Sequence, residues 1–213
     1  MAKYVKLKSD LSRFDSAIYS TRPRQLRSIN ESEYKAYGWY FVEEHYEYRT
    51  DKDLYRYVQQ SWEIQEDGKV HVFYIPEMVS LEARRSIMSQ RVTELRDRKL
   101  QNGLIFRGKE FDTQPQTYVR LTGAVLKAVR DPQFGTGWIT RDNSQVLLAN
   151  EDVLSLGDAY ADFESQFIMF ARGLKDQIEE SMTPEQFDIT TGWPSNEYDA
   201  TGTLNVVKEG NAN

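Results

Sequence analysis

The sequence predicts an α+β protein with a small β-rich N-terminal domain (residues 1–80), a three-helix domain with two β-hairpins (residues 81–182) and a flexible C-terminal tail (residues 183–213). Three patterns support this fold class. Strand-like runs flank an Asp-Gly turn near the N-terminus, two short aromatic hairpins lie in the middle of the chain, and a helical pattern follows each of these hairpins. With 213 residues the chain is long enough to bury a core.

The β-rich domain is predicted mainly from one hairpin. Residues 58–65 and 69–75 are strand-like and flank Glu66-Asp67-Gly68, and Asp-Gly between two such runs is among the stronger short-range hairpin signals. We expect Pro76 to end the second strand, because proline cannot donate a ladder hydrogen bond. A further strand is expected at residues 39–42.

The first thirty residues are expected to form an extended arm. Arg22-Pro23-Arg24 argues against regular structure there, because the residue before a proline is driven away from the helical region.

The first helix of the central domain is predicted over residues 81–101. Its apolar positions recur at three- and four-residue spacings, and Asn102-Gly103 supplies a C-terminal stop. A solvated basic face is favoured for the rest of the helix, with contact to an acidic partner as the alternative. The apolar positions are Leu81, Met88, Val92 and Leu95, and the basic ones are Arg84, Arg85, Arg91, Arg96, Arg98 and Lys99.

The first hairpin (residues 104–113) is predicted to turn at Arg107-Gly108. Thr113 and Gln116 have the spacing of a capping box, in which each side chain satisfies the orphan N–H of the other residue, so the second helix is predicted to begin there. Asp131-Pro132 is expected to end this helix. Its predicted buried face consists of Tyr118, Leu121, Val125 and Val129.

The second hairpin (residues 138–148) precedes the strongest helical pattern in the chain, with Asn150 as its predicted N-cap. Two interpretations fit this helix: a long core helix, or a seam that self-associates, for example around a threefold axis. Burial within one chain is favoured, because three helices and two hairpins need a common buried element to pack against. The apolar positions are Val153, Leu156, Tyr160, Phe163, Phe167, Phe170, Leu174 and Ile178.

Pro, Gly, Asn, Ser and Thr dominate the predicted tail. Residues 187–190 and 203–207 are strand-capable, and we expect them to add to a sheet edge of this chain or of a partner.

Composition argues against several classes of partner. The net charge of −6 and the pI near 5.1 count against a nucleic-acid-binding protein. Without cysteine there is no disulfide framework, thiolate metal site or cysteine nucleophile. No apolar run reaches the length of a membrane span, and residues 1–8 lack the apolar core of a signal peptide. We therefore expect neither nucleic acid nor a membrane as a partner.

No pattern identifies an active site, since the nucleophile elbow, zinc-protease helix, P-loop and dinucleotide fingerprint do not occur. On a strand, Glu43, His45 and Glu47 would share a face and form a conceivable metal cluster, but one histidine among exposed glutamates is more often a polar strand face. His71 is expected to be a surface residue. Turn formation accounts for Asp142-Asn143. We expect no catalytic residue, cofactor, metal or small-molecule substrate.

The segment from about residue 84 to 180 resembles a domain of unknown function that is common in bacteriophage tail regions and is often encoded next to tail-fibre genes. The resemblance rests on a charged helix ending in Asn102-Gly103, on the two hairpins and on the helices that follow them. The sequences that carry it are Phe106-Arg107-Gly108-Lys109-Glu110-Phe111-Asp112-Thr113, Trp138-Ile139-Thr140-Arg141-Asp142-Asn143, the small residues Gly123, Ala124 and Ala128, and Ala171-Arg172-Gly173-Leu174-Lys175-Asp176-Gln177-Ile178.

This resemblance implies a tail-fibre assembly chaperone or a small fibre accessory protein. The expected partner is the C-terminal tip of a trimeric tail fibre, with three copies of this chain per trimer. The expected location is the host cytoplasm during assembly, with retention on the virion tail left open. The alternative role is a structural tail component, such as a fibre adaptor or baseplate-associated protein. A metal-dependent or glycan-processing hydrolase that uses Glu43, His45 or Glu47 is the least favoured alternative.

Aromatic residues make up 13% of the chain, and Tyr and Trp are enriched on protein-binding surfaces. The equally favoured alternative for each of them is core packing. The residues expected to contact the partner are Trp39, Phe41, Trp62, Tyr74, Trp138 and Trp193.

Overall fold

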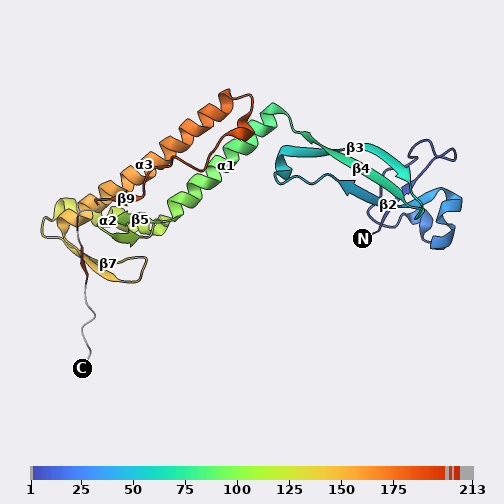
Figure 1. Ribbon diagram of the computed structural model, residues 1–213. Coiled ribbons are helices and arrows are strands. Elements are labelled where there is room, and N and C mark those ends of the chain that lie inside the picture. The colour runs from blue at the N-terminus through green and yellow to red at the C-terminus, as the bar shows by residue number, and fades with distance from the viewer. Residues whose placement is uncertain (1, 200–201, 203, 207–213) are drawn as a thin grey trace. The chain divides into compact units, whose positions relative to one another are not determined.

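The computed structural model describes residues 2–199, 202 and 204–206 (Figure 1). The chain divides into two compact units, Met1–Ser80 and Leu81–Asn213, which are called the N-terminal unit and the C-terminal unit below. The fold is mixed α+β with several small sheets, and the predicted fold class is confirmed at this level.

The N-terminal unit is built on a four-stranded sheet with the order β1-β2-β4-β3. The β3–β4 pair is the predicted hairpin around the Asp-Gly turn, and β2 contains the strand predicted at residues 39–42. β4 also pairs with β2, in parallel, which no local pattern had indicated. The strands are β1 (Lys3–Lys6), β2 (Trp39–Tyr46), β3 (Tyr55–Ile64) and β4 (Val70–Met78).

The prediction of an extended N-terminal arm was wrong. β1 pairs antiparallel with β2, and the short 3₁₀ helices η1 (Arg24–Leu26) and η2 (Glu31–Tyr37) follow it, with η3 (Lys52–Leu54) before β3. Successive strand residues point to opposite faces of a sheet, and both faces of β1 find apolar neighbours. Tyr4 packs with Leu26, Tyr34 and Trp39 on one face, and Val5 packs with Leu7, Val70 and Val72 on the other.

Pro76 does not end β4, contrary to expectation. The strand continues to Met78, and Pro76 lies opposite Tyr57. The parallel ladder to β2 ends at Tyr74, so Pro76 stands where β4 has a single neighbouring strand and fewer hydrogen-bond donors are required.

The C-terminal unit combines three α-helices with two three-stranded sheets among the described residues, in the orders β6-β5-β9 and β10-β8-β7. Its helices are α1 (Leu81–Gln101), α2 (Pro115–Arg130), α3 (Asn150–Glu180) and the short 3₁₀ helix η4 (Pro184–Gln186). Its strands are β5 (Leu104–Phe106), β6 (Lys109–Phe111), β7 (Thr136–Ile139), β8 (Gln145–Leu148), β9 (Glu197–Tyr198) and β10 (Asn205–Val206). None of the helices among the described residues has the length and apolar character of a membrane span.

The long helix α3 is buried within its own chain, as the favoured interpretation expected. Its N-terminal part packs against both hairpins, and Phe163 and Phe167 belong to one core cluster with Phe106, Phe111 and Trp138. Its second half runs alongside α1 (Figure 1), where Ala171, Leu174 and Ile178 meet Met88 and Val92.

The basic face of α1 is partly used inside the unit. The Arg84 guanidinium pairs with the Glu185 carboxylate at 2.7 Å, and Arg85 donates to the Ser181 carbonyl at 3.0 Å. These contacts tie α1 to the segment that follows α3. The solvated basic face that was predicted therefore does not extend to these two arginines.

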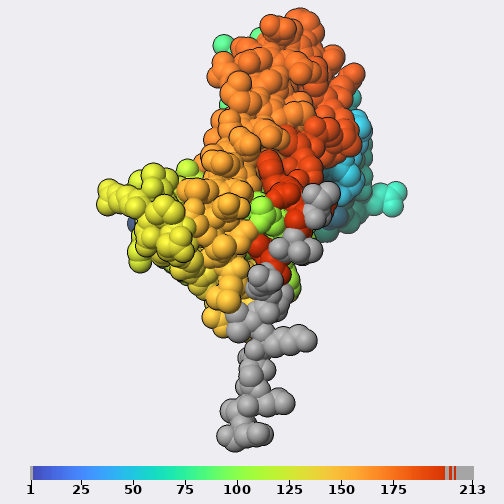
Figure 2. Space-filling view, turned by 90° about the vertical axis from the view of Figure 1, so that its left-hand side faces the viewer, coloured from blue at the N-terminus to red at the C-terminus, as the bar shows by residue number. Residues whose placement is uncertain are grey.

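The segment after α3 is not a flexible tail over its described part. Phe187, Ile189 and Trp193 pack on the core between α1 and α3, and Figure 2 shows this segment (red) lying against α3 (orange). β9 adds to β5 in parallel, and β10 adds to the edge of β8. Residues 187–190 form no strand. Of the strand expected at residues 203–207, positions 203 and 207 lie outside the described residues, as do positions 208–213.

Both predicted helix caps differ in the structure. α2 begins at Pro115, and the Thr113 hydroxyl donates to the Leu100 carbonyl instead of capping the helix. At α3, the Asp152 carboxylate accepts the Ala149 N–H at 2.8 Å. Asn150 instead donates from its side chain to two carbonyls at the C-terminal end of α2, those of Ala128 and Asp131.

Candidate functional site

Residues of the two β-hairpins, on which the resemblance to a known domain rests, form hydrogen bonds and ion pairs with one another. The Arg141 guanidinium pairs with the Glu110 carboxylate at 2.6 Å, and the Arg141 N–H donates to the Glu110 carbonyl at 2.8 Å. Gly103 adopts φ +92°, and a Cβ there would lie within 3.0 Å of Glu110, Arg141 and Phe111. The Asn102-Gly103 signal therefore marks the close approach of the two hairpins as well as the end of α1.

Arg107 connects the first hairpin to two other parts of the unit. Both Arg107 and Gly108 have positive φ, as a two-residue type I′ turn requires. The guanidinium binds the Asp152 carboxylate at the start of α3 and the Asp199 carboxylate after β9. The hydrogen bond with Asp199 raises the pKa of Arg107 despite some burial.

Asp142 has a structural role at the tip of the second hairpin, in agreement with the turn interpretation. Its carboxylate accepts hydrogen bonds from the Ser144 and Thr140 hydroxyls, both at 2.6 Å, and from the Ser144 N–H at 3.0 Å. The Ser144 and Thr140 side chains hold the pKa of Asp142 well below its usual range. Lys109 of the first hairpin approaches the same carboxylate at 3.3 Å. These groups therefore hold the tips of the two hairpins together.

An apolar groove lies beside these hairpins, where α1, α2 and α3 come together. It has a volume of about 340 Å³, within the range of about 300–1,000 Å³ that is typical of ligand sites. Each of the three helices contributes side chains to its walls. The lining residues are Leu100, Thr113, Pro115, Tyr118, Val119, Tyr160, Phe163 and Glu164, and the name apolar groove refers to this set.

The polar groups in the walls of the groove are largely satisfied from within the chain. The Tyr160 hydroxyl donates to the Asp112 carbonyl, and burial raises the pKa of Tyr160. The Thr113 hydroxyl is likewise held by a backbone carbonyl. Glu164 is exposed and supplies a carboxylate to the wall. The surface offered to a ligand is therefore apolar with an acidic group.

The groove continues into exposed apolar residues on α2. The predicted buried face of this helix was partly wrong, because Tyr118 and Val129 are exposed by 43% and 68%, while Thr117, Leu121 and Ala128 face the core. The close approach of α2 to α3 fixes this orientation. Gly157 of α3 lies so near Val125 that an added Cβ would collide with it at 2.6 Å.

Val119 and Leu126 lie two turns apart on the same side of α2 and are exposed by 71% and 55%. Together with Tyr118 and Val129 they form the α2 row. Figure 2 shows α2 (yellow-green) at the side of α3 (orange). Sequence reasoning missed Val119 and Leu126 as candidate site residues. The signal that could have revealed them is a second set of apolar residues off the predicted buried face.

The aromatic residues expected to bind a partner are largely engaged in packing. Trp39 and Trp138 are buried in the two units, with 5% and 4% of their surfaces exposed, so neither offers a free contact surface. The other four are partly buried. Phe41, Trp62 and Tyr74 pack on the cores of the N-terminal unit, and Trp193 packs on those of the C-terminal unit.

Tyr74 also belongs to an aromatic cluster on one face of the N-terminal sheet. The Tyr46 ring stacks on Tyr74 with centroids 4.7 Å apart and meets Tyr57 edge-on at 5.1 Å. Both the Tyr46 and the Tyr74 hydroxyls donate to the Glu44 carboxylate. Burial and the hydrogen bond with Glu44 raise the pKa of Tyr46 to about 12.

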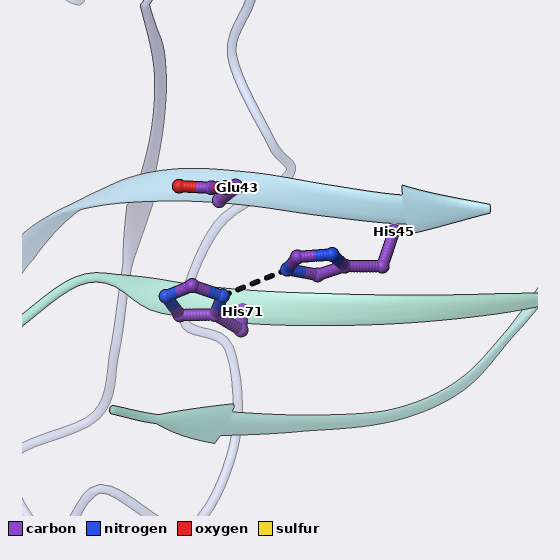
Figure 3. Close-up of side chains that lie close together, drawn as sticks. All are labelled: Glu43, His45 and His71. Atoms are coloured by element: carbon purple, nitrogen blue, oxygen red, sulfur yellow. Dashed lines mark hydrogen bonds between the residues drawn. The ribbon is translucent and has the colours of Figure 1, made fainter. Parts of the chain in front are cut away.

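Two histidines meet on the opposite face of the same sheet. The parallel register of β2 and β4 places His71 opposite Glu43, and His45 follows two residues later on the same face. Figure 3 shows the two imidazole rings approaching through nitrogens, with His45 Nε2 2.7 Å from His71 Nδ1. Glu43, His45 and His71 offer ligand atoms that all lie within 4.8 Å of one another, and they are called the histidine cluster.

The histidine cluster differs from the metal cluster conceived from the sequence. Glu47 lies beyond the end of β2 and pairs with Arg49 at 2.6 Å. His71, expected at the surface, is 6% exposed and takes the third position. The pairing of β4 with β2 supplies it, and alternation within β4 alone could not indicate that neighbour.

The match to a known protein family lies within the C-terminal unit. The family model for a domain of unknown function, DUF4376, matches residues 82–191, which are 110 of the 213 residues. All residues of the apolar groove fall inside this match, and the histidine cluster falls outside it. No curated protein and no solved structure matches the chain.

Proposed function

We propose that this chain, which belongs to the family of the domain of unknown function DUF4376, is a bacteriophage tail-fibre assembly chaperone. It would bind the C-terminal tip of a trimeric tail fibre in the host cytoplasm, with three copies on each trimer, and promote fibre folding and trimerisation. Its role would be binding and not catalysis. The resemblance of its hairpins and helices to phage tail-region domains supports the choice of partner.

The observation that carries the proposal is the apolar groove with its continuation along the α2 row. Val119, Leu126 and Val129 are each more than half exposed on one short helix. Soluble monomers rarely leave large contiguous apolar patches uncovered unless these patches bind something. An apolar side chain of a partner could enter the groove, while the α2 row would cover neighbouring apolar surface.

The physical need for such a partner follows from the fold expected of fibre tips. Intertwined β-rich trimers depend on pairing between distant segments, so they fold slowly. Strand edges and apolar side chains stay exposed meanwhile and promote aggregation. A protein that covers these surfaces until the trimer closes would raise the yield of correctly folded fibre.

The test is co-expression with the C-terminal half of the tail-fibre protein encoded next to this chain. We expect that fibre fragment to be insoluble alone and to elute as a soluble complex with this chain. Light scattering on size exclusion gives the mass, and three copies of each protein are expected. A fragment that folds and trimerises equally well alone would refute the chaperone role. Presence of this chain in purified virions would then favour the structural tail component.

Surface variants test whether the apolar groove and the α2 row bind the fibre fragment. The double change Val119→Lys and Leu126→Lys should abolish complex formation, because it places two charges on the surface proposed to bind apolar groups. Both residues are more than half exposed, so the fold should be retained. Met169→Lys is the matched control, since Met169 is 67% exposed on α3 and does not line the groove. Equal soluble yields from the double variant and the control would exclude the α2 row.

A further inference from the structure

We propose that the histidine cluster of the N-terminal unit is a binding site for a zinc ion. Zinc prefers imidazole nitrogen and carboxylate oxygen as ligands. The cluster provides two imidazole nitrogens, from His45 and His71, and one carboxylate, from Glu43. Three protein ligands leave a fourth position for water or another ligand. This site lies in a different unit from the apolar groove, and its argument does not depend on the proposed fibre partner.

The sheet holds the two strands that carry these ligands in fixed register. Glu43 and His45 come from β2, and His71 comes from the parallel neighbour β4 (Figure 3). The His45 ring lies nearly parallel to the Phe73 ring, with centroids 4.9 Å apart, and this contact limits its orientation. An ion bound here would bridge β2 and β4 and would therefore stabilise the folded unit.

Asp67 orients His71 for this role. His71 Nε2 lies 3.2 Å from both oxygens of the Asp67 carboxylate, which only accepts hydrogen bonds. The Nε2 atom therefore carries the proton, and Nδ1 presents its lone pair toward His45. A carboxylate behind a ligating histidine is the recurrent arrangement of zinc sites, where it fixes the tautomer and the ring.

The adjustment that zinc requires is small. The nitrogens of His45 and His71 are 2.7 Å apart, and a tetrahedral ion with Zn–N bonds of about 2.0–2.1 Å separates its ligands by roughly 3.3 Å. His71 is buried and stays in place, while His45 is half-buried and Glu43 is exposed, so these two side chains can move. The ion would replace the hydrogen bond between the rings.

Lys69 is the group that competes with the ion. Its ammonium lies 2.8 Å from the Glu43 carboxylate and 3.2 Å from the Asp67 carboxylate. Removal of the Lys69 ammonium should therefore tighten zinc binding.

The experiment is calorimetric titration of ZnCl₂ into the full chain, purified without a histidine tag and treated with a chelator. We expect one zinc ion per chain and a higher midpoint of thermal unfolding with zinc present. His45→Gln should weaken binding at least tenfold, and Glu43→Gln should weaken it less. Absence of saturable binding to the wild-type chain would overturn the proposal.

Two variants separate loss of a ligand from loss of folding. Lys69→Met should bind zinc roughly two- to fivefold more tightly, as expected when an exposed ion pair that competes with the ion is removed. Glu47→Gln removes a carboxylate near the same strand that does not belong to the histidine cluster, and it should bind like the wild type. Excess Ca²⁺ should not displace zinc, because calcium prefers oxygen ligands. Equal affinities of the wild type, His45→Gln and Lys69→Met, or displacement by Ca²⁺, would refute the site.

Discussion

The C-terminal unit uses its most recognisable residues to hold its own hairpins together, whereas the N-terminal unit brings its two histidines together on one face of a sheet. Arg107, Arg141 and Asp142 carry the resemblance to a known domain, and each is bound to groups of the same unit. In the N-terminal unit, His45 and His71 meet across two parallel strands, and no short sequence motif joins them.

This difference shows that a recognisable motif and a binding surface need not coincide. Turns with positive φ and close backbone approaches accept few residue types, so they leave a readable sequence pattern. A groove only needs apolar side chains of suitable size, and many sequences supply them. The hairpin motif of this chain can thus be found in the sequence, while the apolar groove that supports its proposed function is visible only in three dimensions.

The largest expected effect separates the two units as folding units. Phe111 is fully buried in the C-terminal core, and Phe111→Ala should reduce the free energy of unfolding by about 3–5 kcal/mol through loss of burial and formation of a cavity. If each unit folds on its own, urea unfolding should show two transitions, and only one of them should move to lower urea.

The matched control for Phe111→Ala is Val72→Ala, a fully buried apolar residue of the N-terminal core. It should shift the other transition and leave the first in place. A single transition that both variants shift together would show that the two units unfold cooperatively.

An intermediate effect is expected at Arg107, where the turn of the first hairpin is bound to Asp152 and Asp199. Arg107→Ala should cost about 1–3 kcal/mol of unfolding free energy, because it removes charge-assisted hydrogen bonds, of which the one to Asp152 is partly buried. Arg107→Gly should cost about 1 kcal/mol less than Arg107→Ala, since φ +47° is unfavourable for a residue with a Cβ. Chemical denaturation of both variants gives the comparison.

The two Arg107 variants separate the contribution of the guanidinium charge to stability from that of the backbone conformation at this position. Equal stabilities of the alanine and glycine variants would show that the turn stores no backbone strain. Wild-type stability of both would show that the ion pairs contribute nothing, which would remove the structural explanation for this part of the motif.

Local patterns were sufficient to predict most elements but not their partners. Periodicity and turn chemistry identified β2, the β3–β4 hairpin and the three α-helices. Pairing between distant segments leaves no local signal. β4 pairs directly with β2 although β3 lies between them in the sequence, and this pairing supplies His71 to the histidine cluster. Sequence reasoning had therefore placed Glu43 and His45 on one face but chose Glu47 as the third residue.

The orientation of α2 shows the same limit within one helix. Tyr118, Leu121, Val125 and Val129 gave a consistent apolar face, but the buried residues of α2 are Thr117, Leu121 and Ala128. The contact of Val125 with Gly157 of α3 fixes this orientation, and it depends on how two helices 20 residues apart in the chain approach. The groove beside α2 gathers side chains from three segments, so its residues could not be selected from the sequence.

The smallest expected effect concerns acid, and it compares matched turns in the two units. The Asp188 carboxylate of the C-terminal unit accepts hydrogen bonds from the Thr190 and Thr191 hydroxyls and from the Thr190 N–H, which lower its pKa to about 2. Asp10 of the N-terminal unit accepts two from Ser12, and these lower its pKa.

A carboxyl whose pKa is lower in the folded state stabilises the fold above its unfolded pKa of about 3.9, and this contribution is lost as pH falls through the folded pKa. Stability should therefore decrease between about pH 4 and pH 2, and Asp188→Asn should make that decrease shallower. The measurement is the urea midpoint at several values of pH in this range. Asp10→Asn should change the slope less, because that carboxylate accepts fewer hydrogen bonds. A larger change of slope in Asp10→Asn than in Asp188→Asn would contradict this prediction. The number of hydrogen bonds at each turn would then not explain how the stability of the two units depends on pH.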